Sequence, residues 1–377
     1  MTNETVPSQR RRRPGRRFAG AASIAVLLAV CGTLTACSTP TPPPSDDANV
    51  FLLIANYSGH HIEVLSAVDD PAALQHDTGA GFTTEDDASV AMAVFGPDGR
   101  IYVADHGVGR ILVYDADAAF AASAPAPVAV ITSADIIEPV ALAFNAAGEL
   151  WVVDRRRSSE GDPHANRLVK LHSAGTAVGP TDLDGTTVVE FDDAASPDFK
   201  YDQLGGLFID QTGNIWVTDV LNWNVARIDD PDGLLGVVLG VVPDLQFKSV
   251  DFAAPDDSAI RNPTSLAMDA DGRLYIGNRG QTSVARFDDP YAVTNNALSV
   301  APSAVIVSGL PNTTLVAVDG DGALWVASSG PADPATIARF ANPGSGMGLQ
   351  TPAASTTFAW APANAYAAGG GMLFHTR

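Results

Sequence analysis

Short apolar runs alternate with glycine-containing turns from about residue 50 onward, and no stretch shows a sustained helical period. Five stretches share one order: an apolar strand, a tight turn, a second strand with an aromatic residue between apolar neighbours, and a polar end. They are residues 90–115, 140–157, 205–229, 264–288 and 315–330. A third strand follows, as in RILVYD, NVARID, SVARFD and TIARFA. The pattern predicts a repeated antiparallel unit of about four strands.

The second strand of each unit carries a large aromatic residue at one position. These residues are Tyr102, Trp151, Trp216, Tyr275 and Trp325. Such side chains fill the space between neighbouring sheets when each sheet packs its face on the next, so Trp216 is expected to be buried. Repeats of roughly 40 to 60 residues with about four strands are typical of a β-propeller. We therefore predict an all-β fold, a β-propeller with four-stranded antiparallel blades.

The number of blades depends on the two ends of the chain. Five units run from about residue 89 to residue 352, and the ends add a hairpin at 51–66 and a segment at 358–376. A sixth blade, closed by strands from both ends, accounts for most of these residues. Six blades are the leading prediction, with seven as the alternative because each end segment could form a partial blade.

Two segments resemble known propeller repeats. Residues 263–288, PTSLAMDADGRLYIGNRGQTSVARFD, are similar to an NHL repeat, and residues 55–66, ANYSGHHIEVLS, are similar to a YVTN repeat. The repeats as a whole resemble NHL, YVTN and SMP-30-type propellers over about residues 50–374. The resemblance implies the propeller fold, whereas one fold of this kind carries many functions.

The first 36 residues have the order of a processing segment. Six arginines between positions 10 and 17 precede an uncharged, mostly apolar run at 18–36. The run ends in Leu34-Thr35-Ala36-Cys37, which resembles the lipobox of bacterial lipoproteins. The resemblance implies a cleaved signal peptide at 1–36 and a lipid on Cys37. A Pro-rich tether at 37–49 and a single propeller at 50–377 then belong to a membrane lipoprotein facing the periplasm or the cell surface.

The composition excludes several classes of function. The net charge is −21, and the predicted signal peptide holds six of the 22 Lys and Arg but only one of the 43 Asp and Glu. Because so acidic a surface repels phosphate backbones, we expect no nucleic-acid partner. We also expect the protein to be a monomer. Cys31 and Cys37 are the two cysteines, so the predicted mature body has no disulfide and no thiolate metal ligand.

Polar residues at the ends of the second strands share one face of a propeller with those that lead into the first strands. The candidates at strand ends are Asp105, His106, Asp154, Arg155, Asp219, Asn278 and Arg279, and those before first strands are Glu138 and Asn262. In one interpretation the Asp and Asn residues cap loops by accepting from backbone amides. In the other, some of them converge on a divalent cation.

The resemblance to SMP-30-type lactonases implies a metal held by Glu, Asn and Asp on this face. Glu138 and Asn262 match two of these roles, and Asp154 or Asp219 the third. That family has Pro-Asn-Gly before a first strand, whereas this chain has Asn262-Pro263-Thr264, which puts the metal in doubt. We therefore expect no cofactor, with Ca²⁺ or Zn²⁺ as the alternative.

The leading functional prediction is a non-enzymatic one. A membrane-anchored propeller outside the cytoplasm acts as a binding or scaffold module for a protein, peptide or glycan. The alternative is a metal-dependent hydrolase or lyase of the SMP-30 or streptogramin-lyase type. A zinc-dependent lyase of the NHL fold has less support, because Trp223 stands where a ligand histidine is expected.

Overall fold

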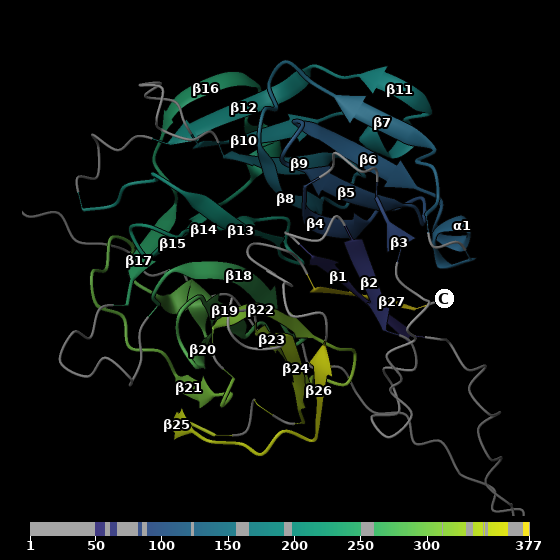
Figure 1. Cartoon of the computed structure of the whole chain (residues 1–377). Helices are drawn as coiled ribbons and strands as arrows, with labels where there is room; N and C mark the ends of the chain where they lie inside the picture. Colours follow the sequence, from purple (N-terminus) through teal and green to yellow (C-terminus); the bar gives the residue numbers. More distant parts are fainter. Residues whose placement is uncertain are drawn as a thin grey trace, which may run out of the picture. The chain divides into compact units, whose positions relative to one another are not determined.

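The computed structural model in Figure 1 describes most of the chain after residue 49. The described residues are 50–56, 61–65, 82–84, 89–121, 124–155, 166–191, 198–249, 260–310, 312–328, 335–341, 343, 346–360 and 372–376. The predicted signal peptide and tether lie outside them. Residues Ala48–Arg377 form one compact unit. Of the helices that the described residues form, none is long and apolar enough to cross a bilayer.

Five blades follow one another along the chain, each with four antiparallel strands. Blades 1 and 2 are β4 (Val90–Phe95), β5 (Ile101–Asp105), β6 (Arg110–Tyr114) and β7 (Ala129–Thr132), then β8 (Pro139–Phe144), β9 (Leu150–Arg155), β10 (Asn166–Leu171) and β12 (Gly185–Phe191). Blade 3 is β13 (Leu204–Ile209), β14 (Ile215–Asp219), β15 (Asn224–Ile228) and β17 (Leu245–Lys248). Blades 4 and 5 are β18 (Pro263–Met268), β19 (Leu274–Asn278), β20 (Ser283–Phe287) and β21 (Ala304–Val307), then β22 (Thr313–Val318), β23 (Leu324–Ser328), β24 (Ala335–Phe340) and β26 (Thr356–Trp360).

A further sheet joins the two ends of the described chain. Its strands, in spatial order, are β27 (Met372–Thr376), β1 (Val50–Asn56), β2 (His61–Leu65) and β3 (Phe82–Thr83). The first strands of successive blades contact one another from β4 through β8, β13 and β18 to β22, and β27 contacts both β22 and β4. The fold is therefore an all-β propeller. Five blades of consecutive strands are observed, so the prediction of six rests on the sheet that joins the chain ends.

The connection from the third to the fourth strand adds a strand to the preceding blade. β11 (Gly179–Asp182) pairs in parallel with β7, β16 (Gly236–Val241) with β12, and β25 (Gly348–Gln350) with β21. In blade 4, Ala297 makes a single parallel bridge to Phe247 in β17 of blade 3. Among the described residues, three sheets thus carry a fifth, parallel strand beyond the four antiparallel strands that were predicted for a blade, and the added strands lie at the outer edges in Figure 1. The short helical turns also lie in these connections: α1 (Ala116–Ala121), η2 (Ala174–Thr176), η3 (Pro231–Gly233) and η4 (Pro290–Ala292).

The repeated aromatic position is buried in every blade, as predicted. All five side chains are 0% exposed: Tyr102, Trp151, Trp216, Tyr275 and Trp325. Four of them, Tyr102, Trp151, Trp216 and Tyr275, share apolar clusters with residues of the following blade, and Trp216 lies in one cluster with Leu266 and Ile276 of blade 4. The strand register inferred from the sequence is therefore correct at this position.

An aspartate in the turn before the second strand holds the aromatic residue. The indole nitrogen of Trp216 donates to Asp210 at 2.8 Å, and that of Trp325 donates to Asp319 at 2.8 Å. A cation from the third strand lies over the ring, because the guanidinium of Arg227 is 5.4 Å from the Trp216 centroid. The aromatic position therefore ties three neighbouring strands together.

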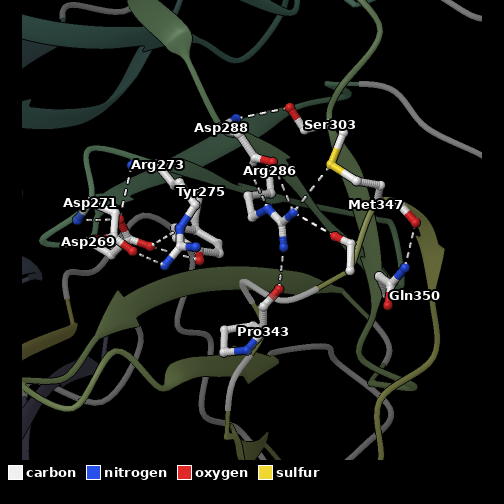
Figure 2. A network of polar contacts seen from close by, with 11 residues as sticks. Asp269, Asp271, Arg273, Tyr275, Arg286, Asp288, Ser303, Pro343, Met347 and Gln350 are labelled. Atoms are coloured by element: carbon white, nitrogen blue, oxygen red, sulfur yellow. Dashed lines mark hydrogen bonds and ion pairs between the residues drawn. The ribbon is translucent and has the colours of Figure 1, made fainter.

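Figure 2 shows the version of this arrangement in blade 4. Tyr275 donates to Asp269 at 3.0 Å, and Asp269 also accepts from the side chain of Arg273 at 2.6 Å. Arg286, on the third strand, pairs with Asp288 and donates to the carbonyl oxygens of Pro343 and Gly346. The latter residues belong to blade 5, so this buried arginine fixes the connection that supplies β25.

Candidate functional site

The end of the molecule predicted to carry the site is built the same way in all five blades. A polar residue at or next to the end of each second strand pairs with the first residue of the first strand, and a bulge follows in each case. These residues are Asp105, Asp154, Asp219, Asn278 and Ser328. We call this end the cap end. A bulge kinks the strand locally and is common beside functional sites.

Asp105 and Asp154 bind the loops next to them. Asp105 accepts from the backbone amide of Ser89 at 2.8 Å and from Arg110 at 2.7 Å. Asp154 accepts from two consecutive backbone amides, of Ile137 and Glu138, both at 2.7 Å. An arginine from the third strand neutralises it too, since Arg167 lies 3.4 Å away. Both carboxylates therefore act as loop caps.

Asp219 caps its loop without an arginine. It accepts from the backbone amides of Gln203 at 2.7 Å and Asn222 at 2.6 Å. Asn224 occupies the first position of its third strand, where blade 1 has Arg110. Burial raises the pKa of Asp219 to about 6, although the hydrogen bonds lower it. A buried carboxyl with a raised pKa is the most unusual titratable group at the cap end.

The structure brings some predicted residues together and separates others. Asp219, Asn262, Asn278 and Arg279 lie on the adjoining loops of blades 3 and 4. The others lie on blades 1 and 2: Asp105, His106, Glu138, Asp154 and Arg155. There the backbone amides of His106 and Arg155 donate to the carbonyls of Ser89 and Glu138. Within the described ranges, no group of three or more His, Cys, Asp or Glu is arranged to hold a metal ion.

Trp223 and Asn262 form the most distorted part of the cap end. Their φ angles are 58° and 47°, and the indole nitrogen of Trp223 donates to Oδ1 of Asn262 at 2.9 Å. Asparagine adopts the left-handed conformation readily, whereas a bulky tryptophan rarely does. The same position before the third strand of blade 1 is Gly109, with φ 77°. Such strain persists where surrounding contacts impose it, and it often marks a functional site.

Two arginines flank this tryptophan. The guanidinium of Arg261 lies 5.4 Å from the Trp223 ring centroid, and the backbone amide of Arg279 donates to the carbonyl of Asn262 at 3.0 Å. Both arginine side chains are exposed, and neither forms an ion pair with any described residue. We call Trp223, Arg261, Asn262 and Arg279 the Trp223 site.

The Trp223 site combines a half-buried aromatic ring with two exposed arginines that form no ion pair with a described residue, on a chain of net charge −21. Guanidinium groups bind carboxylates in a planar, two-point manner, and an indole ring stacks on flat or apolar ligand surfaces. This arrangement suits recognition of an anionic ligand. Sequence reasoning found Asn262 and Arg279 but missed Trp223, whose backbone conformation gave no signal in the sequence.

These features define the class of protein as a β-propeller with its loop-capping residues at one end. Its fold is similar to a chain of the nidogen/laminin complex, with a TM-score of 0.53 and 15% identity over 86% of this chain and 98% of that chain. Streptogramin B lyase follows, with a TM-score of 0.47 and 15% identity over 82% and 81%. Virginiamycin B lyase from Staphylococcus aureus gives 0.39 and 14% over 69% and 72%. At these identities the similarity defines the fold alone.

No protein-family model matches the chain, and no curated protein matches it. The chain is therefore a β-propeller protein whose function has to be argued from its own residues.

Proposed function

We propose that the protein is a lipid-anchored binding module that recognises a protein, peptide or glycan outside the cytoplasm. The observation that carries this proposal is the Trp223 site, where a strained tryptophan is held by Asn262 between two arginines without ion-pair partners among the described residues. A loop cap needs only glycine at this position, as in blade 1, so the ring has a role beyond the fold.

The chemistry of the site favours a ligand with an acidic group next to a flat or apolar surface. Leu221, two residues before Trp223 on the same loop, is 59% exposed and adds apolar surface to this loop. The acidic remainder of the chain repels such a ligand elsewhere, so Arg261 and Arg279 direct it to this place. Acidic glycans and acidic peptides both meet this description.

A metal-dependent hydrolase or lyase is the second candidate, and Asp219 is the observation in its favour. Its carboxyl is buried and its pKa is raised to about 6 by burial, as catalytic carboxyl groups often are. Ca²⁺ or Zn²⁺ bound near Asp219 would require ligands in addition to its backbone-bonded oxygens. Metal analysis of the purified protein separates the two candidates, because the binding module needs no metal.

We infer a six-bladed ring and a membrane anchor as the frame for this role. The contacts of β27 with β22 and β4 support the terminal sheet as the sixth blade. The lipobox-like sequence before Cys37 supports lipidation, and the Pro-rich residues after it support a spacer that holds the propeller away from the bilayer.

The test is a binding screen with full-length Cys37→Ser protein, which keeps every residue of the propeller. Acidic and neutral glycans and peptides are compared by intrinsic tryptophan fluorescence and by calorimetry. We expect an acidic ligand whose affinity falls at least ten-fold in Arg261→Ala/Arg279→Ala, while Arg155→Ala, an arginine on blade 2, serves as the matched control. Equal binding by the double variant and the control would contradict the proposal.

A further inference from the structure

The opposite end of the first strands encloses a cavity of about 390 Å³. Three consecutive residues from each of β8, β13, β18 and β22, together with Met92, Val94 and Phe95 of β4, line it. Every lining residue that the structure describes is Met, Val, Leu, Ile, Phe or Ala. We call this space the channel cavity. Its volume falls in the range of small-molecule pockets, which are mostly apolar.

Towards the cap end, the first strands of blades 3, 4 and 5 pack closely on one another. A Cβ on Gly206 would lie 3.0 Å from Cα of Ser265 in the next blade. Ser265 in turn donates to the carbonyl of Thr314 at 3.0 Å and accepts from the amide of Val316 at 3.0 Å. Small residues and cross-blade hydrogen bonds thus hold these three strands close together.

At the other end the first strands finish in larger residues. Phe95, Phe144 and Met268 are half-buried, whereas Leu142 and Val316, deeper along the strands, are buried. The half-buried residues therefore form the mouth of the channel cavity. Phenylalanine rings and flexible methionine thioethers provide a surface that adapts to apolar ligands.

Acidic turns surround this mouth, because each turn follows directly on a lining strand. The turns 96–100, 145–149, 210–214, 269–273 and 319–323 hold seven carboxylates and two arginines. Two cations from third strands also reach them, since Lys170 lies 3.4 Å from Glu149 and Arg339 lies 3.0 Å from Asp319. Carboxylates still outnumber cations. Hydrogen bonds from Thr212, Trp216 and Tyr291 outweigh burial and lower the pKa of Asp210 to about 2, so that group is ionised at neutral pH.

We propose that the channel cavity binds the apolar body of a cationic amphiphile, whose positive head group lies among the acidic turns. The apolar lining removes the hydrocarbon part from water, and the excess of carboxylates at the mouth selects a positive head over a negative one. This site lies at the other end of the first strands from the Trp223 site and does not depend on the proposed function.

The experiment titrates full-length Cys37→Ser protein by calorimetry with three probes of equal chain length. They are decyltrimethylammonium, decanol and decanoate, all below the concentrations at which they aggregate. We expect one saturable site for the cation, with at least ten-fold weaker binding of decanol and decanoate. Raising the salt concentration should lower the affinity for the cation more than the affinity for the other two probes.

Two variants locate the site, and a third serves as the control. Asp271→Asn/Asp321→Asn removes two exposed carboxylates from the mouth and should weaken the cation about three- to ten-fold while leaving decanol unchanged. Ala317→Leu adds volume to the lining and should weaken all probes, and Trp223→Gly at the other end should weaken none. Absence of saturable binding, equal affinity for cation and decanol, or an unchanged affinity in the charge variant would overturn the proposal.

Discussion

The two ends of the first strands are built from the same five repeats, yet their chemistry is opposite. At the cap end, carboxylates such as Asp105 and Asp154 are buried under backbone amides, and Arg261 and Arg279 are exposed. At the other end, the interior is apolar and carboxylates surround the mouth. Residues that obey the repeat build the frame, and residues that depart from it, such as Trp223, differentiate the two ends.

Removing a residue of the repeated aromatic position, which supports the whole blade, should have the largest effect on stability. Trp216→Ala leaves a large void between blades 3 and 4 and frees Asp210 from its indole partner. We expect a loss of about 3–5 kcal/mol in the free energy of unfolding, measured by urea denaturation. A loss below about 1 kcal/mol would mean that the aromatic position does not hold the blades together.

The next largest effect on stability concerns Asp219, the aspartate cap that pairs with no arginine among the described residues. Because the folded pKa of Asp219 is about 6, above its ordinary 3.8, the folded state takes up a proton more readily than the unfolded state. The contribution of Asp219 to the free energy of unfolding is fully present below about pH 4 and is lost as the pH rises through 6. The change amounts to about 2–3 kcal/mol. Asp219→Asn should remove this part of the pH dependence, and Asp105→Asn should leave it in place. Identical stability profiles for the parent and Asp219→Asn would contradict the assignment.

Backbone strain separates blades 1 and 3 by a smaller amount. A Cβ on Gly109 would lie 2.6 Å from the carbonyl oxygen of Ile137, so Gly109→Ala should destabilise by about 1–3 kcal/mol. Trp223→Gly relieves a left-handed φ and should change stability by about 1 kcal/mol or less, while ligand binding at the Trp223 site is lost. Thermal denaturation and binding assays on both variants test the contrast. If Trp223→Gly were the more destabilising of the two, the tryptophan would be a structural residue.

The smallest effect on the propeller should come from the anchor. If Cys37 carries the proposed lipid, Cys37→Ser should move the protein from the membrane fraction to the soluble fraction with no change in melting temperature, because the proposed tether would separate the anchor from the propeller. Cell fractionation and calorimetry measure the two quantities. Retention of the variant in membranes would refute lipidation as the means of attachment.

The sequence predicted what the repeat imposes and little else. Trp216 and its equivalents were placed correctly because strand alternation and turn chemistry fix their register. The added strand β11, with the sequence GPTD, escaped notice because it has no apolar alternation and pairs with another repeat. The channel cavity was also missed, since its width depends on how far the first strands diverge. Trp223 was missed because nothing in the sequence Asn222-Trp223-Asn224 predicts a positive φ.

The strands that one blade adds to the preceding blade impose an order on folding during synthesis. Thr132, on the outer strand of blade 1, is joined to Asp182, and Gln246 of blade 3 to Asn296, each pair 50 residues apart. As the chain emerges from its N-terminus, each outer strand therefore waits for about one further repeat before its backbone groups are covered. An uncovered strand edge is a template for pairing with other chains. A polypeptide interrupted at any blade boundary would carry such an edge, so early termination should yield aggregation-prone fragments.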